Sequence, residues 1–452
     1  MARNRIALLV CLLSWDLAQG AEDLRAQTRC AVPLVMQSLG KLGLERPVRA
    51  TRAARQAPAP VTREFWAWDL TVMPPGFRRV PTTLRAEGPR GLVYVEDAEW
   101  GKTIDQAAVD TILATFETRT PRHPELGIAD VDTAAFGEIP AGLDGDSRVV
   151  LLFAKLGRFQ GQGFDGFFNA FDTMTEAEAW SRYEQHSNEC NVLYLNTDGS
   201  PPASDYMLAV VAHELVHLQA HPYDPEEMAW VGETLGEAGM LLCGYDTDQA
   251  HARRYASKPS TPLVTEPYVS YGACLFLAAA MADQQPAGFL KRLTAEPLQG
   301  MAGVERTLES FGPSDGFEGL YERWVASNYV TGAGGTAPDY TYSSVHVPQM
   351  AATAVPASGL APLEGRMQAT GVVYLRFESG GEYTLRLESD GPAGMRALHL
   401  SSPATAAAAA APLAFQRAQQ ASLSVGTGDV VAFYGLAPGV YRYRVSVAPA
   451  GH

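Results

Sequence analysis

The sequence predicts an α+β protein with a mainly helical middle part and an antiparallel β-sandwich at its C-terminal end. Between residues 204 and 329, apolar residues recur at helical spacing. After residue 371, short segments alternate apolar and polar residues between Gly, Asp and Pro turns, as in a sandwich of two sheets. The chain has 452 residues, of which 46% are hydrophobic and 19% charged, so it can build the cores of two or three domains.

The elements follow one another in three blocks. In the first block we expect strands and one helix at 65–73, 82–88, 90–100, 104–117 (the helix), 148–154 and 191–197. The expected helices of the second are 204–220, 225–243, 268–283, 287–295, 303–310 and 317–329. The expected strands of the third are 371–377, 381–389, 396–401, 421–426, 429–435 and 439–448. We interpret 351–362 as a linker and the polyalanine run 406–411 as a surface loop.

The start of the chain has the features of a secretory signal peptide. Arg3 and Arg5 precede the apolar run 6–15, and small residues follow it, so we expect cleavage after Gly20. The run is too short for a bilayer span, and no later run could stop transfer. We therefore expect a secreted protein with this order: a signal peptide (1–20), a linker or propeptide-like segment (21–63), an N-terminal β-rich part (64–145), a mainly helical domain (146–335), and a linker with the sandwich (336–452).

The net charge of −15 argues against two classes of function. Acidic residues outnumber basic ones 50 to 35, which argues against nucleic-acid binding, because phosphate contacts need a clustered basic surface. It also argues against a polybasic membrane anchor.

Four cysteines remain after cleavage of the signal peptide. Cys30, Cys190, Cys243 and Cys274 allow two disulfides in three pairings, of which we favour Cys243–Cys274. The alternative is that some are buried thiols. No pair has CxxC spacing, so a zinc site made of cysteines is not expected.

The motif that carries chemistry is HExxH, formed by His213, Glu214 and His217 in an apolar helix. A helix places residues i and i+4 on one face, so both imidazoles can reach one cation. Glu214 lies beside them, where a carboxylate can take a proton from a water on the metal. The motif therefore predicts a zinc site.

A third ligand is not supplied by the same helix. Ala220 and Tyr223 stand where the pattern HExxHxxGxxH needs its glycine and third histidine. His221 lies about 12 Å along the helix from His213, too far for one cation. We expect His221 to be a helix-end residue, favoured there by the helix dipole.

The next helix offers two glutamates. Asp224 suits its N-cap and Pro225 its first turn. If this helix runs back antiparallel from there, Glu233 lies level with the histidines, and Glu237 lies one turn further on. We favour Glu233 as the ligand and Glu237 as an acceptor for the outer nitrogen of His213.

HELVH (213–217) and WVGETLGEAG (230–239) resemble the gluzincin metallopeptidases, and segments 166–198, 270–281 and 317–330 resemble the secreted hyicolysin-like peptidases. The resemblance covers about residues 64–330 and implies a zincin-like catalytic domain. It implies His213, His217 and Glu233 as zinc ligands and Glu214 as general base. Fifteen residues separate His217 from Glu233, and the nineteen of thermolysin would select Glu237, so the two glutamates remain in competition.

Other catalytic groups are less defined. Tyr268 and Tyr271, with His251 behind them, are candidates to stabilise the oxyanion. Strand 191–197 is a candidate edge for binding a substrate backbone. Asp144-Gly145-Asp146 suits a turn better than a calcium site, so calcium is possible but unsupported.

These features together predict a secreted zinc endopeptidase that acts on protein or peptide substrates. The alternatives are a non-catalytic secreted binding protein on the same scaffold and a zinc aminopeptidase. An intact Glu214 argues against the first, and no acidic motif for a substrate N-terminus supports the second.

Overall fold

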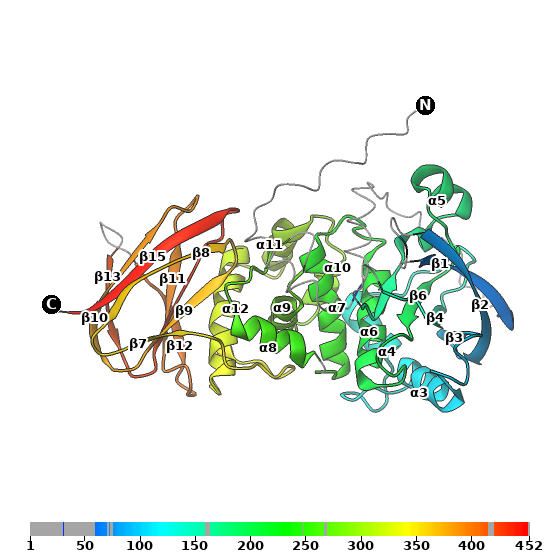
Figure 1. The fold of residues 1–452 in the computed structure, drawn as a ribbon, viewed down its shortest axis with the longest axis horizontal. Helices are drawn as coiled ribbons and strands as arrows, with labels where there is room; N and C mark the ends of the chain where they lie inside the picture. Colours follow the sequence, from blue (N-terminus) through cyan, green and yellow to red (C-terminus); the bar gives the residue numbers. More distant parts are fainter. Residues whose placement is uncertain are drawn as a thin grey trace.

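The computed structural model describes residues 30, 59–69, 72, 76–158, 163–246, 248–265, 269–414 and 420–450. The expected signal peptide lies outside these residues, as does most of segment 21–63. With 33% helix and 27% strand, the protein is mixed α+β, as the sequence predicts. Figure 1 shows a six-stranded sheet at one end of the long axis, helices in the middle and two further sheets at the other end.

The six-stranded sheet has the order β1-β2-β3-β4-β6-β5. Its strands are β1 (Thr62–Asp69), β2 (Gly76–Glu87), β3 (Gly91–Glu96), β4 (Val149–Ala154), β5 (Gly166–Phe168) and β6 (Val192–Asn196). The central strands β3, β4 and β6 run parallel and are wholly buried, as expected for strands covered on both faces. Their side chains alternate between two separate cores.

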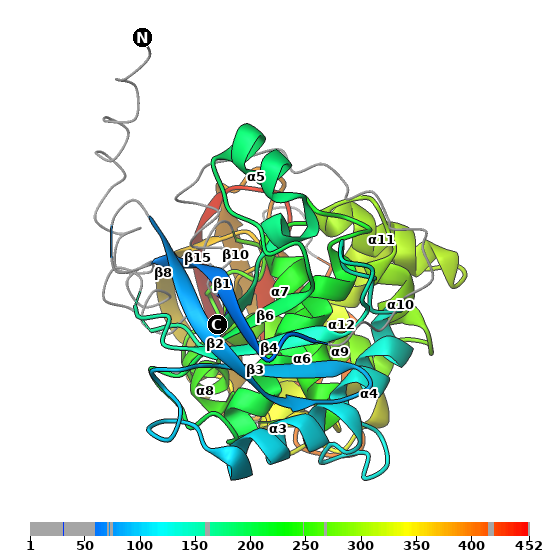
Figure 2. The ribbon, with the colours of Figure 1, turned by 90° about the vertical axis from the view of Figure 1, so that its right-hand side faces the viewer.

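Helices cover one face of this sheet. The helices α3 (Gln106–Glu117), α4 (Ile128–Phe136) and α6 (Asp205–Ala220) share a core with alternate residues of β3, β4 and β6. On the opposite face, residues of β1 and β2 extend the core formed by β3, β4 and β6, and this core also includes residues of the short helix η1 (Ala170–Thr173) and of α5 (Glu176–Tyr183). Figure 2 views the molecule from this end, with α5 above the sheet and α3 below it.

The helical middle is built around α9 (Tyr271–Gln284), which is buried from Tyr271 to Met281. It packs against α7, α8 and α12. The remaining helices of this part are α7 (Ala229–Cys243), α8 (Gln249–Ser257), α10 (Phe289–Thr294), α11 (Gly300–Ser310) and α12 (Gly316–Gly332). No helix of the described residues is both long and apolar enough to cross a membrane.

Two further sheets follow α12, with the orders β13-β10-β15-β8 and β12-β11-β14-β9-β7. Their strands are β7 (Thr353–Val355), β8 (Leu360–Gln368), β9 (Val372–Phe377), β10 (Gly381–Ser389), β11 (Arg396–Ser401), β12 (Ala409–Pro412), β13 (Gln420–Val425), β14 (Val430–Tyr434) and β15 (Val440–Pro449). Both sheets contribute apolar residues to one core. The second sheet also packs on α12, where the Tyr374 hydroxyl donates to the carbonyl oxygen of Val325 at 2.9 Å.

Most expected elements are present within a few residues of their predicted ends, but two interpretations of the C-terminal part are wrong. Segment 351–362 is no linker, since it contains β7 and the start of β8. The polyalanine run ends in strand β12, which pairs with β11. Alanine has no periodic signal of its own, so only the neighbouring strand reveals this pairing.

The predicted start of the glutamate helix is also wrong, because α7 begins at Ala229 with Met228 as N-cap. Asp224 instead folds a turn, accepting a bond from the Glu226 amide at 3.2 Å. The Glu227 carboxylate accepts from the Gly300 amide at 2.7 Å, which ties this turn to α11. A turn bonded to a distant helix thus occupies the residues where the sequence predicts the first turn of α7.

The favoured disulfide is not formed. Cys30, Cys190, Cys243 and Cys274 are buried, and none of them is in a disulfide. The Cys243 thiol donates to the carboxylate of Asp132, and the Cys274 thiol donates to a backbone carbonyl of α7. The two thiols thus have separate partners, and burial raises the pKa of both.

Candidate metal centre

Helix α6 carries HExxH into the interior. Ser204 caps its start by accepting from the Met207 amide, and the helix packs between the sheet and α7. Its buried positions include polar residues: His213 and Glu214 are both 0% exposed. Burying such groups costs free energy unless they are paired or bind a ligand, so this helix is unlike an ordinary core helix.

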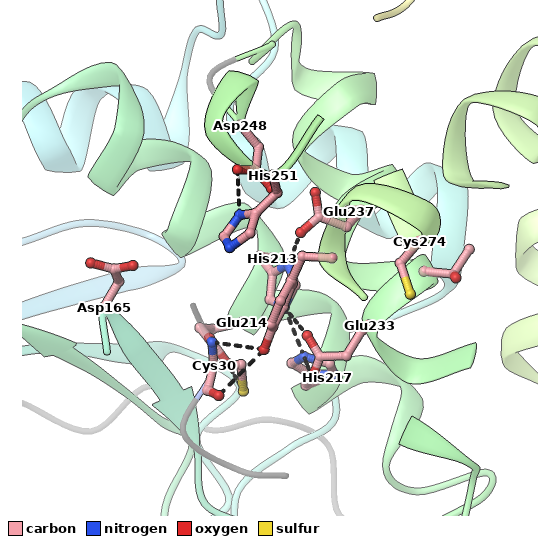
Figure 3. Close-up of polar contacts among 12 residues, drawn as sticks. Cys30, Asp165, His213, Glu214, His217, Glu233, Glu237, Asp248, His251 and Cys274 are labelled. Atoms are coloured by element: carbon pink, nitrogen blue, oxygen red, sulfur yellow. Dashed lines mark hydrogen bonds and ion pairs between the residues drawn. The ribbon is translucent and has the colours of Figure 1, made fainter. Parts of the chain in front are cut away.

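Four ligand atoms converge between α6, α7 and Cys30. The Nε2 atoms of His213 and His217 lie 3.1 Å apart. Glu233 of α7 places Oε2 3.0 Å from His213 Nε2 and Oε1 3.8 Å from His217 Nε2. With Cys30 Sγ, all four ligand atoms lie within 4.8 Å of one another. Figure 3 shows these side chains gathered around one point.

This spacing fits a metal ion. Ligands about 2.0–2.3 Å from a tetrahedral ion lie about 3.3–3.8 Å from each other. The measured separations fall in or near that range, and a set of two imidazole nitrogens, one carboxylate oxygen and one sulfur is a set that zinc accepts. The cluster could therefore hold a metal ion, and every member except the half-buried His217 is fully buried.

Glu237 lies on the other side of the first histidine. Its Oε1 is 3.7 Å from His213 Nδ1, the ring nitrogen that faces away from the cluster. The structure thus separates the two glutamates, with Glu233 at the inner nitrogens and Glu237 at the outer one. A carboxylate at the outer nitrogen orients a ligating imidazole and increases its basicity.

Two helix glycines let α7 approach α6 this closely. A Cβ atom on Gly236 would lie 2.6–2.8 Å from atoms of the His213 ring. One on Gly239 would lie 2.7 Å from Val216 Cγ2. Gly232 is different, since its Cβ would meet only His217 Cε1 at 3.9 Å, an ordinary contact. Close packing thus explains two of the three glycines in the sequence of α7.

Burial lowers the pKa of two histidines at the C-terminal end of α6. It lowers the pKa of His217 to about 4, although the nearby Glu233 carboxylate acts in the opposite direction. Burial also lowers the pKa of His221 to about 4. His221 is the C-cap of α6, as expected, and its buried ring packs near Phe168, where desolvation opposes the positive charge that an interaction with the helix dipole would need.

Glu214 points toward the edge of the six-stranded sheet. Its Oε2 accepts a hydrogen bond from the Phe168 amide of β5 at 3.1 Å. The edge strand is β5, whereas β6, which includes most of segment 191–197, lies between β4 and β5. The prediction of 191–197 as the edge for substrate is therefore wrong. The three residues of β5 give too short a signal to be recognised in the sequence.

Tyr271 joins the site from the start of α9. Its hydroxyl lies 3.3 Å from the backbone nitrogen and 3.4 Å from the backbone oxygen of Cys30. Burial raises the pKa of Tyr271 well above its usual value, so the phenol keeps its proton and can donate it in a hydrogen bond. Tyr268 lies outside the described residues.

His251 lies behind Tyr271, with ring centroids 5.2 Å apart. Its Nδ1 is 2.6 Å from Asp248 Oδ1, a contact drawn in Figure 3. The carboxylate of Asp248 orients this imidazole. Sequence reasoning named His251 but missed Asp248, which stands in a connection without any motif.

The Asp144–Asp146 segment forms a turn. Asp144 Oδ1 accepts from the Asp146 amide at 2.9 Å, and the Asp146 carboxylate pairs with Arg148 at 2.6 Å. Both carboxylates thus serve the turn and its ion pair, and nothing in their geometry supports calcium.

Comparisons with known proteins add little. No family model matches the chain, and no curated protein matches it. Among solved structures, two periplasmic inhibitors of g-type lysozyme, from Aeromonas hydrophila and Salmonella Typhimurium, align over 95% and 97% of their own lengths and 21% of this chain, with 12% and 10% identity and TM-scores of 0.16. The pre-peptidase C-terminal domain of a Bacillus anthracis collagenase aligns over 98% of its length and 22% of this chain, with 15% identity and a TM-score of 0.17. Likenesses with such low TM-scores support no conclusion about function.

Proposed function

We propose that the protein is a secreted zinc endopeptidase of the gluzincin type, with a zincin-like domain followed by a C-terminal β-sandwich. The observation that carries the proposal is the convergence of His213, His217 and Glu233 on one point, with Glu214 next to them on α6 and aimed at the sheet edge. Three protein ligands that leave a further position are typical of catalytic zinc sites, whereas structural sites are closed by four.

Each residue of the site has a separate role in the proposed reaction. Zinc at this site would polarise the substrate carbonyl and make a bound water acidic. Glu214 accepts the proton of that water and passes it to the leaving amine. The Glu237 carboxylate, 3.7 Å from Nδ1, helps to orient the His213 ring electrostatically. Tyr271, protonated because it is buried, donates a hydrogen bond to the developing charge on the substrate oxygen.

Strand β5 supplies the binding edge in this proposal. It is the outermost strand beside the site, and its Phe168 amide already contacts Glu214. An extended peptide can add to such an edge through main-chain hydrogen bonds. The scissile bond of that peptide would then lie over the metal and Glu214.

Metal content and casein digestion, each measured with and without a chelator, test this function. We expect about one zinc per chain and proteolysis that stops on chelation and returns with zinc. If the zinc-loaded protein binds casein without cutting it, even when nothing blocks the metal site, the result would instead support the binding-protein alternative. Release of only N-terminal residues would support an aminopeptidase.

A further inference from the structure

Cys30 contributes the fourth ligand atom of the metal cluster. Its Sγ lies within 4.8 Å of the inner atoms of His213, His217 and Glu233. The same sulfur lies 3.6 Å from Glu214 Oε2, the proposed general base. The side chain is 0% exposed. The contact with Glu214 joins residues that are 184 positions apart in the sequence. A sulfur in this place reaches both groups that the proposed reaction needs.

The backbone of Cys30 occupies the binding edge as well. It forms an isolated bridge with Gly166 of β5, in parallel orientation. Its backbone nitrogen and oxygen both lie within hydrogen-bonding distance of the Tyr271 hydroxyl. Cys30 thus uses the edge strand and the phenol that a substrate backbone would use. These backbone contacts are independent of the sulfur and point to the same position.

We propose that Cys30 is the fourth zinc ligand and that it keeps the full-length chain latent. This inference rests on the proposed function, since it concerns the same metal. Cysteine binds zinc as the thiolate, so ligation releases the thiol proton, and the Glu214 carboxylate beside the sulfur can accept it. With the sulfur bound, the site has four protein ligands, which is the closed arrangement of non-catalytic zinc sites. Water and a substrate carbonyl then have no position on the metal.

Zinc X-ray absorption on the full-length protein tests the ligation directly. We expect one sulfur neighbour at about 2.3 Å in the wild type, together with nitrogen and oxygen neighbours. Cys30→Ser and Cys30→Ala should retain zinc and lose the sulfur signal. Cys190→Ala is the matched control, because Cys190 is also a buried cysteine outside any disulfide and shares a hydrophobic core with Cys30, but it is not a member of the candidate metal cluster. It should keep the signal.

Peptidase assays on the same proteins test latency. If the contact leaves about a tenth of the chains or fewer open, removing it should raise casein hydrolysis about tenfold or more. Cys190→Ala should not raise it. A zinc-loaded wild type without a sulfur neighbour overturns the ligation, and equal hydrolysis by wild type and both Cys30 variants overturns the latency.

The two proposals fail in different ways. A sulfur signal that depends on Cys30, combined with no hydrolysis by any variant, would leave the ligation standing and contradict the peptidase. Hydrolysis by a wild type that has no zinc–sulfur bond would support the peptidase and contradict the role of Cys30. A protein that takes up no zinc at all would contradict both.

Discussion

The helix pair α6/α7 and the two C-terminal sheets differ in how many polar side chains they bury. The helices bury His213, Glu214 and Glu237 completely, each at 0% exposure. Among the described residues of strands β7 to β15 and their connections, the buried polar side chains are Thr370 and Asp429. Both organise loops: the Asp429 carboxylate, for example, accepts from two loop amides at 2.8 and 2.9 Å.

This difference separates what maintains a fold from what marks a site. The sheets follow the period-two rule, with apolar residues inside and charges outside. The exception is Asp429, whose buried carboxylate is paired with His399 and with loop amides. The helices hold ionisable groups where desolvation disfavours their charged forms. Such a cluster persists when a ligand or a network stabilises it, so buried charge points to function here more directly than the fold does.

The largest expected effect is on catalysis. Glu214→Gln removes the proposed base and leaves the ligands His213, His217 and Glu233 in place. We expect unchanged zinc content and a loss of about 10²–10⁴-fold in the casein hydrolysis rate. Proteins with Glu214 and with the Glu214→Gln substitution should both carry Cys30→Ser, so that latency does not mask the loss of activity. Near-normal turnover by the zinc-loaded variant would sink the assignment of Glu214.

Replacing each of the two glutamates of α7 by alanine, in separate variants, tests which of them binds the metal. Glu233→Ala removes a carboxylate 3.0 Å from His213 Nε2, and we expect it to lose most of its zinc on dialysis. Glu237→Ala removes only the contact to the outer nitrogen, so the loss in affinity should be about 10–100-fold. Zinc per protein after dialysis is the measurement. A full site in Glu233→Ala beside an empty one in Glu237→Ala would reverse the assignment.

A single methyl group should disturb the site through packing. Gly236→Ala places a Cβ against the His213 ring, and we expect about 1–3 kcal/mol of destabilisation and weaker zinc binding. Gly232→Ala is the control on the same helix, because its Cβ has room and should instead stabilise by about 0.5–1 kcal/mol. Denaturant unfolding of the two variants gives the comparison. Equal stability would show that α6 and α7 are not so closely packed.

Asp172 of η1 gives a test of stability against pH, because its carboxyl is buried. Burial raises the pKa of this carboxyl to about 7, although the Asn188 amide and the Tyr194 hydroxyl bond to it. Because the pKa of Asp172 is higher in the folded protein than in the unfolded chain, protonation of this carboxyl stabilises the fold. This stabilisation is complete below pH 3.8, the ordinary pKa, and is lost as the pH rises to about 7. About three pKa units correspond to about 4 kcal/mol.

Asp172→Asn should therefore remove this slope from the pH dependence of the unfolding free energy. Denaturation of both proteins at intervals between pH 4 and pH 8 measures the difference. A wild type and variant with parallel pH profiles would show that Asp172 ionises normally.

The smallest effect is expected where the C-terminal sheets meet α12. Tyr374→Phe removes the hydroxyl that donates to Val325 O, and we expect a loss of about 1 kcal/mol in stability with unchanged zinc content. Calorimetry and metal analysis check both parts. A loss of zinc would mean that the sheets and the metal cluster are energetically coupled, which would break the contrast between the two regions.

Local patterns account for much of what could be predicted. Helical spacing located α6 and placed His213 and His217 one turn apart, since the period of the helix is a property of adjacent residues. Alternation located most strands of the C-terminal sheets for the same reason. The preference for Glu233 agrees with its position in the structure, even though the helix starts four residues later than expected.

Three features were decided by the tertiary structure alone. The edge strand of the sheet is β5 rather than β6, and this order depends on contacts between distant segments of the chain. The turn at Asp224 and Glu227 is bonded to the start of α11, and Cys30 joins a candidate metal cluster whose other members lie far along the chain. No spacing rule applies to residues 184 positions apart, so a lone cysteine carries no signal until the fold brings it to Glu214. The sequence by itself determined the helical spacing of His213 and His217 and offered two glutamates as further candidates, and packing determined which candidate ligands meet.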